Sequence, residues 1–155
     1  EIRLSLVGSE MCIRDSRWTD KEKITPLFPF GHGLSYTSYK YGKAVIDKNI
    51  MGDDEVLTVT VPITNIGMRA GSEIVQMYIS DLKSSLPRPV KELKGFSKVS
   101  LKPGETKKVT FTINKEALSF FDDVRHEWIA EPGIFKAIIA ASATDIRSSV
   151  IFEYK

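Results

Sequence analysis

Two short runs of carboxylates are the residues whose types and spacing could perform chemistry. They are Asp53-Asp54-Glu55 and Asp122-Asp123. Carboxyl groups that lie close together can act as a catalytic acid–base pair or as metal ligands. Both runs lie at turn positions that flank strand-like segments, however, where carboxylates face water and accept local backbone hydrogen bonds. We therefore predict structural roles for them and no catalytic residue in this chain.

The two histidines, His32 and His126, do not form a metal-ligand pattern. Neither has a second histidine or a cysteine at ligand spacing, and the only cysteine is Cys12. No serine or threonine lies in the glycine-rich context of a nucleophile elbow or a phosphate-binding loop. We predict no metal site, no cofactor, and no acyl or phosphoryl transfer. His126 is expected in a hairpin beside acidic residues, and His32 is expected to pack among aromatic side chains.

The pair Arg88-Pro89, followed by Lys91, is the better candidate for a binding contact. Proline restricts the residue before it, so Arg88 would present its planar donor fork at a restrained angle. Such a fork suits a carboxylate or a carbonyl on a neighbouring domain. The alternative for the same residues is a solvated loop.

Composition and charge limit the classes of protein to be considered. A length of 155 residues suits one domain with a single core, and 42% hydrophobic with 27% charged residues is ordinary for a globular chain. No apolar run approaches the roughly 18 residues that could cross a bilayer. The formal net charge is only +2, and the lysines are spread over several segments, which argues against a nucleic-acid partner.

Alternation of apolar and polar residues predicts an all-β fold. In residues 55–65 the apolar side chains fall at Leu57, Val59, Val61 and Ile63, with threonines between them. Similar patterns lie at residues 75–79, 109–113, 137–141 and 150–154, and weaker ones at 41–47 and 93–99. About seven strands at this spacing predict an immunoglobulin- or fibronectin III-like antiparallel sandwich of two sheets with Greek-key connections.

Local signals add turns and one short helix to this pattern. Asn65-Ile66-Gly67, Pro103-Gly104 and Pro132-Gly133 supply residues that tight reversals need. Pro62 lacks a ladder donor, so we expect an edge or a bulge at its position. Asn114 is expected to cap about one turn of helix.

The first sixteen residues are predicted to be foreign to the native protein. Residues 6–16 read LVGSEMCIRDS, which resembles the translation of a common transposase-based sequencing adapter, and residues 1–5 fit the same reading frame. Such segments are excluded from reasoning about the fold, and Cys12 is excluded with them. The alternative is a native strand, because Ile2, Leu4 and Leu6 alternate with Arg3 and Ser5.

Residues 17–38 are irregular and aromatic. Closely spaced prolines and glycines exclude a long helix, yet Phe28, Phe30 and Tyr36 are large apolar side chains that need burial. The apolar faces of the strands are expected to be committed to the core between the two sheets. We therefore expect these aromatic residues to pack on a surface outside the sandwich.

The motifs of residues 26–36, which read PLFPFGHGLSY, resemble the segment that leads into the C-terminal fibronectin type III-like domain of family 3 glycoside hydrolases. The similarity extends over essentially all of residues 17–155. It includes VTVPITNIGMRAGSEIVQMYISD at 59–81, RPVKELKGFSKVSLKPGETKKVTF at 88–111, LSFFDD at 118–123, Trp128, and EPGIFKAIIAASATDIR at 131–147.

The resemblance implies a division of the chain and a role for it. Residues 17–38 would be the tail of a preceding α/β domain, with Arg17-Trp18 in its last strand, followed by an aromatic tether. Residues 39–155 would be the fibronectin III-like domain. In the family, an aspartate nucleophile and a glutamate acid/base lie in earlier domains, and neither motif is present here. The resemblance therefore implies a non-catalytic accessory domain of a β-glucosidase-like parent, for which a periplasmic or secreted location is suspected.

Six residues are predicted to contact the catalytic domains of the parent, which are the partners expected for this chain. They are Phe28, Phe30, His32, Tyr36, Arg88 and Lys91. Carbohydrate substrate would be met only through the parent. The alternative function is an independent cell-surface adhesion or carbohydrate-binding module.

Overall fold

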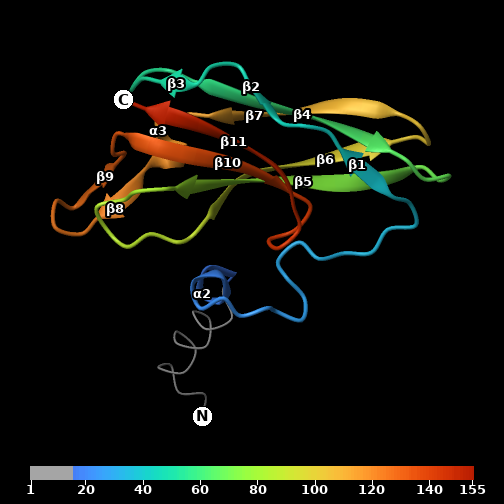
Figure 1. The fold of residues 1–155 in the computed structure, drawn as a ribbon, viewed down its shortest axis with the longest axis horizontal. Coiled ribbons are helices and arrows are strands. Elements are labelled where there is room, and N and C mark those ends of the chain that lie inside the picture. The colour runs from blue at the N-terminus through green and yellow to red at the C-terminus, as the bar shows by residue number, and fades with distance from the viewer. Residues whose placement is uncertain (1–15) are drawn as a thin grey trace, which may run out of the picture.

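The structure, a computed structural model, describes residues 16–155. The prediction that the preceding residues derive from an adapter, Cys12 among them, lies outside the described residues. Within the described residues, the fold consists of two short helices and eleven strands (Figure 1). Their bounds are α2 Ser16–Lys21, β1 Tyr39–Tyr41, β2 Val45–Ile46, β3 Ile50–Met51, β4 Leu57–Asn65, β5 Gly71–Asp81, β6 Glu92–Leu101, β7 Thr106–Ile113, α3 Lys115–Leu118, β8 Phe120–Asp122, β9 Glu127–Ile129, β10 Gly133–Ala140 and β11 Ile146–Tyr154.

The strands form two sheets that lie one above the other (Figure 1). In the first sheet, β4 pairs with β7 along one edge and with β1 and then β2 along the other. The second sheet has the order β3-β11-β10-β5-β6, and β8 and β9 form a separate hairpin. All pairs are antiparallel except β3 with β11. The predicted all-β sandwich is confirmed.

Inward positions of both sheets build the main core. Leu57, Val59, Val61 and Ile63 are fully buried, as the alternation in β4 predicted. The opposite sheet contributes further buried side chains, which include Val75, Met77, Phe135, Ile139, Phe152 and Tyr154. Burying one such side chain stabilises the fold by roughly 1.5–3 kcal/mol relative to leaving it exposed, so this layer is the main source of stability.

Pro62 lies in an inner strand, and the irregularity predicted there falls on the neighbouring strand. Tyr41 pairs with Ile63 and Val45 pairs with Thr60, so three residues (42–44) face two (61–62). This extra residue divides the predicted strand at 41–47 into β1 and β2. The Gly42 amide donates to the Pro62 carbonyl at 2.8 Å. A Cβ at Gly42 would lie 2.5 Å from the Pro62 ring, which explains the glycine at the interruption.

Gly104 and Asn114 perform the roles expected of them, whereas Gly133, which was expected in a tight reversal, begins β10. Gly104 has a φ of +74°, a conformation that glycine adopts without strain, in the turn that links β6 to β7 in the other sheet. The Asn114 side chain accepts the Ala117 amide at 3.1 Å and caps α3.

Residues before β1 differ from the prediction in one respect. Arg17 and Trp18 were expected in a strand, but residues 16–21 form helix α2. From α2 the chain continues without regular structure to Tyr39, and it runs along the side of the sandwich formed by the five-stranded sheet (Figure 1). Residues 16–38 are called the N-terminal segment below.

Candidate functional site

The outer face of the five-stranded sheet carries a second, smaller apolar cluster. Tyr78, Ile138, Ala140 and Ala143 are buried and form a group separate from the main core. Tyr78 lies between the core residues of β5 and therefore points to the opposite face of the sheet. Gln76 is also buried on this face, and its Oε1 accepts the Tyr78 hydroxyl at 2.5 Å. The sheet is thus covered on its outer side as well.

The N-terminal segment contacts this outer face at three points. The Phe30 carbonyl accepts the Ala143 amide at 2.8 Å. Gly31 has a φ of +81°, and a Cβ there would lie 2.0 Å from Gln76 Nε2, so only glycine fits this approach.

The third contact is an ion pair. Lys91 Nζ donates to the Asp20 carboxylate in α2 and lies 5.8 Å from the centre of the Tyr78 ring. The segment therefore packs in part on its own domain, through the outer face of the five-stranded sheet.

The large side chains of the segment nevertheless face solvent. Phe28 is 70% exposed and Phe30 is 57% exposed, and nearby Leu34 is almost fully exposed. On the sheet, Phe96 is 71% exposed and pairs across the strands with Gln76, the residue that Gly31 contacts. Ile74 is half exposed, and it lines the same hollow as Leu34. Phe28, Phe30, Leu34, Ile74 and Phe96 are called the outer apolar surface below.

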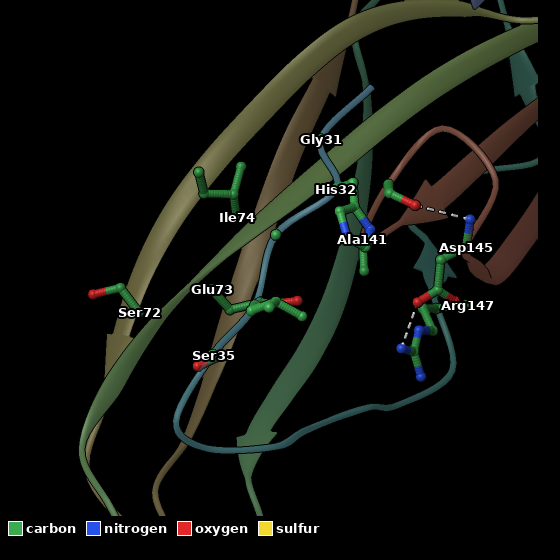
Figure 2. Close-up of a pocket in the computed structure, with 12 residues that line it drawn as sticks. Gly31, His32, Ser35, Ser72, Glu73, Ile74, Ala141, Asp145 and Arg147 are labelled. Carbon is green, nitrogen blue, oxygen red and sulfur yellow. Dashed lines mark hydrogen bonds and ion pairs between the residues drawn. The ribbon is translucent and has the colours of Figure 1, made fainter. Parts of the chain in front are cut away.

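A hollow of about 350 Å³ lies beneath the segment, between β5 and the turn from β10 to β11 (Figure 2). Glu73 projects into it, and its carboxylate accepts the Tyr41 hydroxyl at 2.7 Å. Desolvation raises the pKa of Glu73, and it also raises the pKa of Tyr41. On the other wall Arg147 donates to Asp145 at 2.6 Å. Both carboxylates have partners that hold them in place. The hollow is therefore lined by polar groups in fixed positions.

Four of the six predicted contact residues belong to this exposed segment. Phe28 and Phe30 lie on the outer apolar surface, and the His32 ring packs against Phe28 with centroids 5.3 Å apart. Tyr36 is also exposed, close to where β1 begins. His32 lines the hollow described above (Figure 2).

Arg88 is bound by partners within the domain. Its side chain is only 8% exposed, and it donates to Asp81 at 3.2 Å, to Glu92 at 2.9 Å and to the Leu118 carbonyl at 3.0 Å. The guanidinium also lies 5.1 Å from the centre of the Phe120 ring. These partners exclude the solvated loop, and the interdomain contact of Arg88 stays a prediction. Lys91 is buried and binds Asp20, which lies in the residues that were expected to belong to the tail of the preceding domain.

Sequence reasoning missed Phe96 and Ile74. A signal for Phe96 existed, because it is out of phase with Val99 and lies between Lys94 and Lys98, which places it on the outer face of β6. Ile74 is likewise out of phase with the core residues of β5. Each is a single apolar residue among polar neighbours, a pattern common on ordinary surfaces.

The acidic runs have the predicted roles only in part, because Asp122 is buried and Asp53 binds Lys115 and the Tyr154 hydroxyl, which are distant in sequence. Asp122 Oδ1 accepts the amides of Val124 and Arg125 at 2.9 and 3.1 Å, and Glu55 accepts the Gly52 amide at 2.9 Å. Within residues 16–155, no group of three or more side chains could hold a metal ion. In the same residues no helix is long and apolar enough to cross a membrane.

The Tyr78 hydroxyl reports on how the N-terminal segment is placed. Desolvation raises its pKa from 10.0 to about 12, and the negative charge of Asp20 adds to this shift. The pKa of Tyr78 is higher in the folded protein than in the unfolded protein. The neutral phenol therefore stabilises the fold below pH 10, and this contribution is lost between about pH 10 and 12. Replacing Asp20 by asparagine should lower the pKa of Tyr78, although burial should keep it above 10. An NMR titration of the Tyr78 ring measures this.

Asp145→Asn is the matched control for the Tyr78 titration, because Asp145 does not contribute to the Tyr78 shift. It should leave the pKa of Tyr78 at about 12. An unchanged pKa in Asp20→Asn would show that α2 does not lie over Tyr78 in solution.

Comparison with known proteins identifies the type of domain. The model of the fibronectin type III-like domain matches residues 73–143. "Beta-glucosidase BoGH3A" of Bacteroides ovatus is 56% identical over 138 residues, which cover 89% of this chain and 18% of that protein. "Thermostable beta-glucosidase B" of Acetivibrio thermocellus is 48% identical over 130 residues, which cover 84% of this chain and 17% of that protein.

Solved structures give the same result. A β-glucosidase from Kluyveromyces marxianus, in complex with glucose, superposes with a TM-score of 0.83 at 37% identity, over 90% of this chain and 17% of that one. A β-glucosidase from Listeria innocua, in complex with glucose, gives a TM-score of 0.77 at 38% identity, over 83% and 18%. The chain therefore spans less than a fifth of the length of these relatives.

Proposed function

The chain contains a fibronectin type III-like domain of the kind carried by β-glucosidases of glycoside hydrolase family 3, and from this premise we propose that it is the accessory domain of a longer, β-glucosidase-like parent. In this proposal the domain is non-catalytic and packs against the catalytic domains of the same chain. Residues 17–38 link it to a preceding α/β domain, and residues 39–155 form the sandwich.

The observation that carries the proposal is the outer apolar surface. Exposed phenylalanines on a monomer are usually scattered, whereas Phe28, Phe30 and Phe96 lie around one contact between the N-terminal segment and β5. Fully burying a phenylalanine stabilises by roughly 1.5–3 kcal/mol, which a covering domain would supply. The polar groups of the adjacent hollow would line the rim of this interface.

A free-standing module explains these features less well. Such a module would begin with a polar linker, because an exposed aromatic segment favours aggregation. Here the segment before the sandwich contains Leu27, Phe28, Phe30, Leu34 and Tyr36, all of them more than half exposed. An occupant that covers them in the parent accounts for their presence.

Assays on an aryl β-glucoside test the proposed division of labour. The isolated chain should give no turnover above background. Retaining hydrolysis needs an acid and a nucleophile about 5–5.5 Å apart, and the acidic runs of this chain have structural roles instead. The full-length parent should hydrolyse the same substrate.

Asp53→Asn and Asp122→Asn are the control variants of the isolated chain. Turnover by the chain that survives repurification and is lost in either variant would contradict the proposal.

A further inference from the structure

The β8–β9 hairpin presents two aromatic side chains to solvent. Phe121 and Trp128 are paired across the hairpin, and their rings meet edge to face with centroids 5.8 Å apart. Trp128 is 70% exposed and Phe121 is 49% exposed. On the other side of the hairpin, Asp122 is buried and Phe120 lies against Arg88. The hairpin is therefore fixed to the domain, while its outer side holds the indole as a flat, open platform.

The indole borders a hollow of about 440 Å³ at the end of the sandwich where α3, β8 and β9 lie (Figure 1). The opposite walls are the turn before β4 and helix α3. The lining residues are Asp53, Asp54, Glu55, Val56, Asn114, Lys115, Glu116, Ser119 and Trp128. Apart from Val56 and the indole these side chains are polar, and the volume is within the usual range of about 300–1,000 Å³ for small-molecule sites.

Several hydrogen-bonding groups of the hollow are held in place by the fold. Asp53 accepts Lys115 Nζ at 2.8 Å and the Tyr154 hydroxyl. Glu55 binds Lys48 at 3.1 Å, and Asn114 is fixed as the cap of α3. Hydrogen bonds from Lys115 and Tyr154 hold the pKa of Asp53 below its usual range, and the Gly52 amide together with Lys48 does the same for the pKa of Glu55, so both are ionised acceptors at neutral pH.

The chemistry of these walls selects a class of ligand. One flat apolar platform beside a polar wall does not suit an apolar peptide, which needs a wider apolar area. Lys115 and Lys48 pair with Asp53 and Glu55, and Asp54 and Glu116 add two further acceptor groups to the lining. A sugar ring fits both walls, since it has an apolar face of C–H bonds and a rim of hydroxyl groups. Aromatic residues with a wet edge are well suited to such amphipathic ligands.

We propose that the hollow beside Trp128 is a saccharide-binding subsite, in which a pyranose ring stacks on the indole and its hydroxyls donate to carboxylates of the facing wall. Asp54 and Glu116 are exposed carboxylates of its lining, as are Asp53 and Glu55. The site is separate from the outer apolar surface, so its existence does not depend on the interface proposed above. Only the choice of a glucose disaccharide as the probe rests on the proposed function.

Titration of this 155-residue chain with cellobiose tests the subsite. Isothermal calorimetry and the NMR shift of the Trp128 indole N–H should both show saturable binding, with a Kd on the order of millimolar. Sorbitol, a polyol without a ring, should give no saturable shift. Trp128→Ala should weaken cellobiose binding tenfold or more, while Trp128→Phe retains part of the platform and should bind more tightly than Trp128→Ala.

Phe96→Ala is the matched control, because it removes an exposed aromatic residue on a different face of the domain and should leave cellobiose binding unchanged. Amide NMR spectra of the variants establish that they remain folded. Absence of saturation, equal binding of sorbitol, or unchanged binding in folded Trp128→Ala would each overturn the subsite. None of these results would alter the prediction for the outer apolar surface.

Discussion

Replacing Arg88 by alanine should lower the free energy of unfolding of the isolated chain by about 3–5 kcal/mol, the usual cost of removing one partner from a buried ion pair. The Asp81 side chain is 3% exposed and the Glu92 side chain 14% exposed, so Asp81 would lose the Arg88 counter-charge away from water, and Glu92 would keep Lys94 at 3.8 Å. The Leu118 carbonyl would also lose its donor. Urea denaturation of the wild type and the variant measures the difference.

Two further substitutions separate charge from geometry in the Arg88 experiment. Arg88→Lys keeps the positive charge but not the planar fork, so it should recover only part of the loss. Arg125→Ala removes an exposed arginine that lies 3.6 Å from Asp122, and it should cost less than about 1 kcal/mol. A loss below about 1 kcal/mol for Arg88→Ala would contradict the buried network.

The double variant Phe30→Ala/Phe96→Ala should have very different effects in the isolated chain and in the parent. In the isolated chain both rings are more than half exposed, so the expected loss of unfolding free energy is below about 1 kcal/mol. In the parent, where we propose that both rings are buried, each truncation should cost about 2 kcal/mol or more. The comparison requires two pairs of urea titrations.

Met68→Ala is the control for this comparison, because Met68 is almost fully exposed in the turn between β4 and β5, away from the outer apolar surface. It should cost little in both proteins. Equal losses for the double variant in the two proteins would mean that no other domain covers the outer apolar surface.

The long strands were predictable from sequence because each has one face in a continuous core. Strands β4, β7, β10 and β11, each eight or nine residues long, have at least three apolar residues at alternate positions. Strands β3, β8 and β9 have two or three residues each, too few for a period to be seen. The pairing of these short strands depends on the strands beside them, and a local sequence pattern carries no information about those neighbours.

The contact residues were predicted only in part, for a related reason. The aromatic composition of the N-terminal segment marked Phe28 and Phe30 as side chains that need a partner. The role of Arg88 depends on Asp81 and Leu118, the second of which is thirty residues away in sequence. The burial of Tyr78 on the outer face also depends on the N-terminal segment, which is far from it in sequence. The alternation of residues in β5 alone therefore indicated only one buried face of the sheet.

The fractional exposure of Phe30 and Phe96 in a structure of the full-length parent is the most direct test of the proposed accessory role. The rings are 57% and 71% exposed in this chain. The proposal predicts that both become buried, below roughly a tenth of their free surface, against the catalytic domains, with the N-terminal segment still seated on Gln76 and Ala143. Rings that remain as exposed in the parent as in this chain would contradict it.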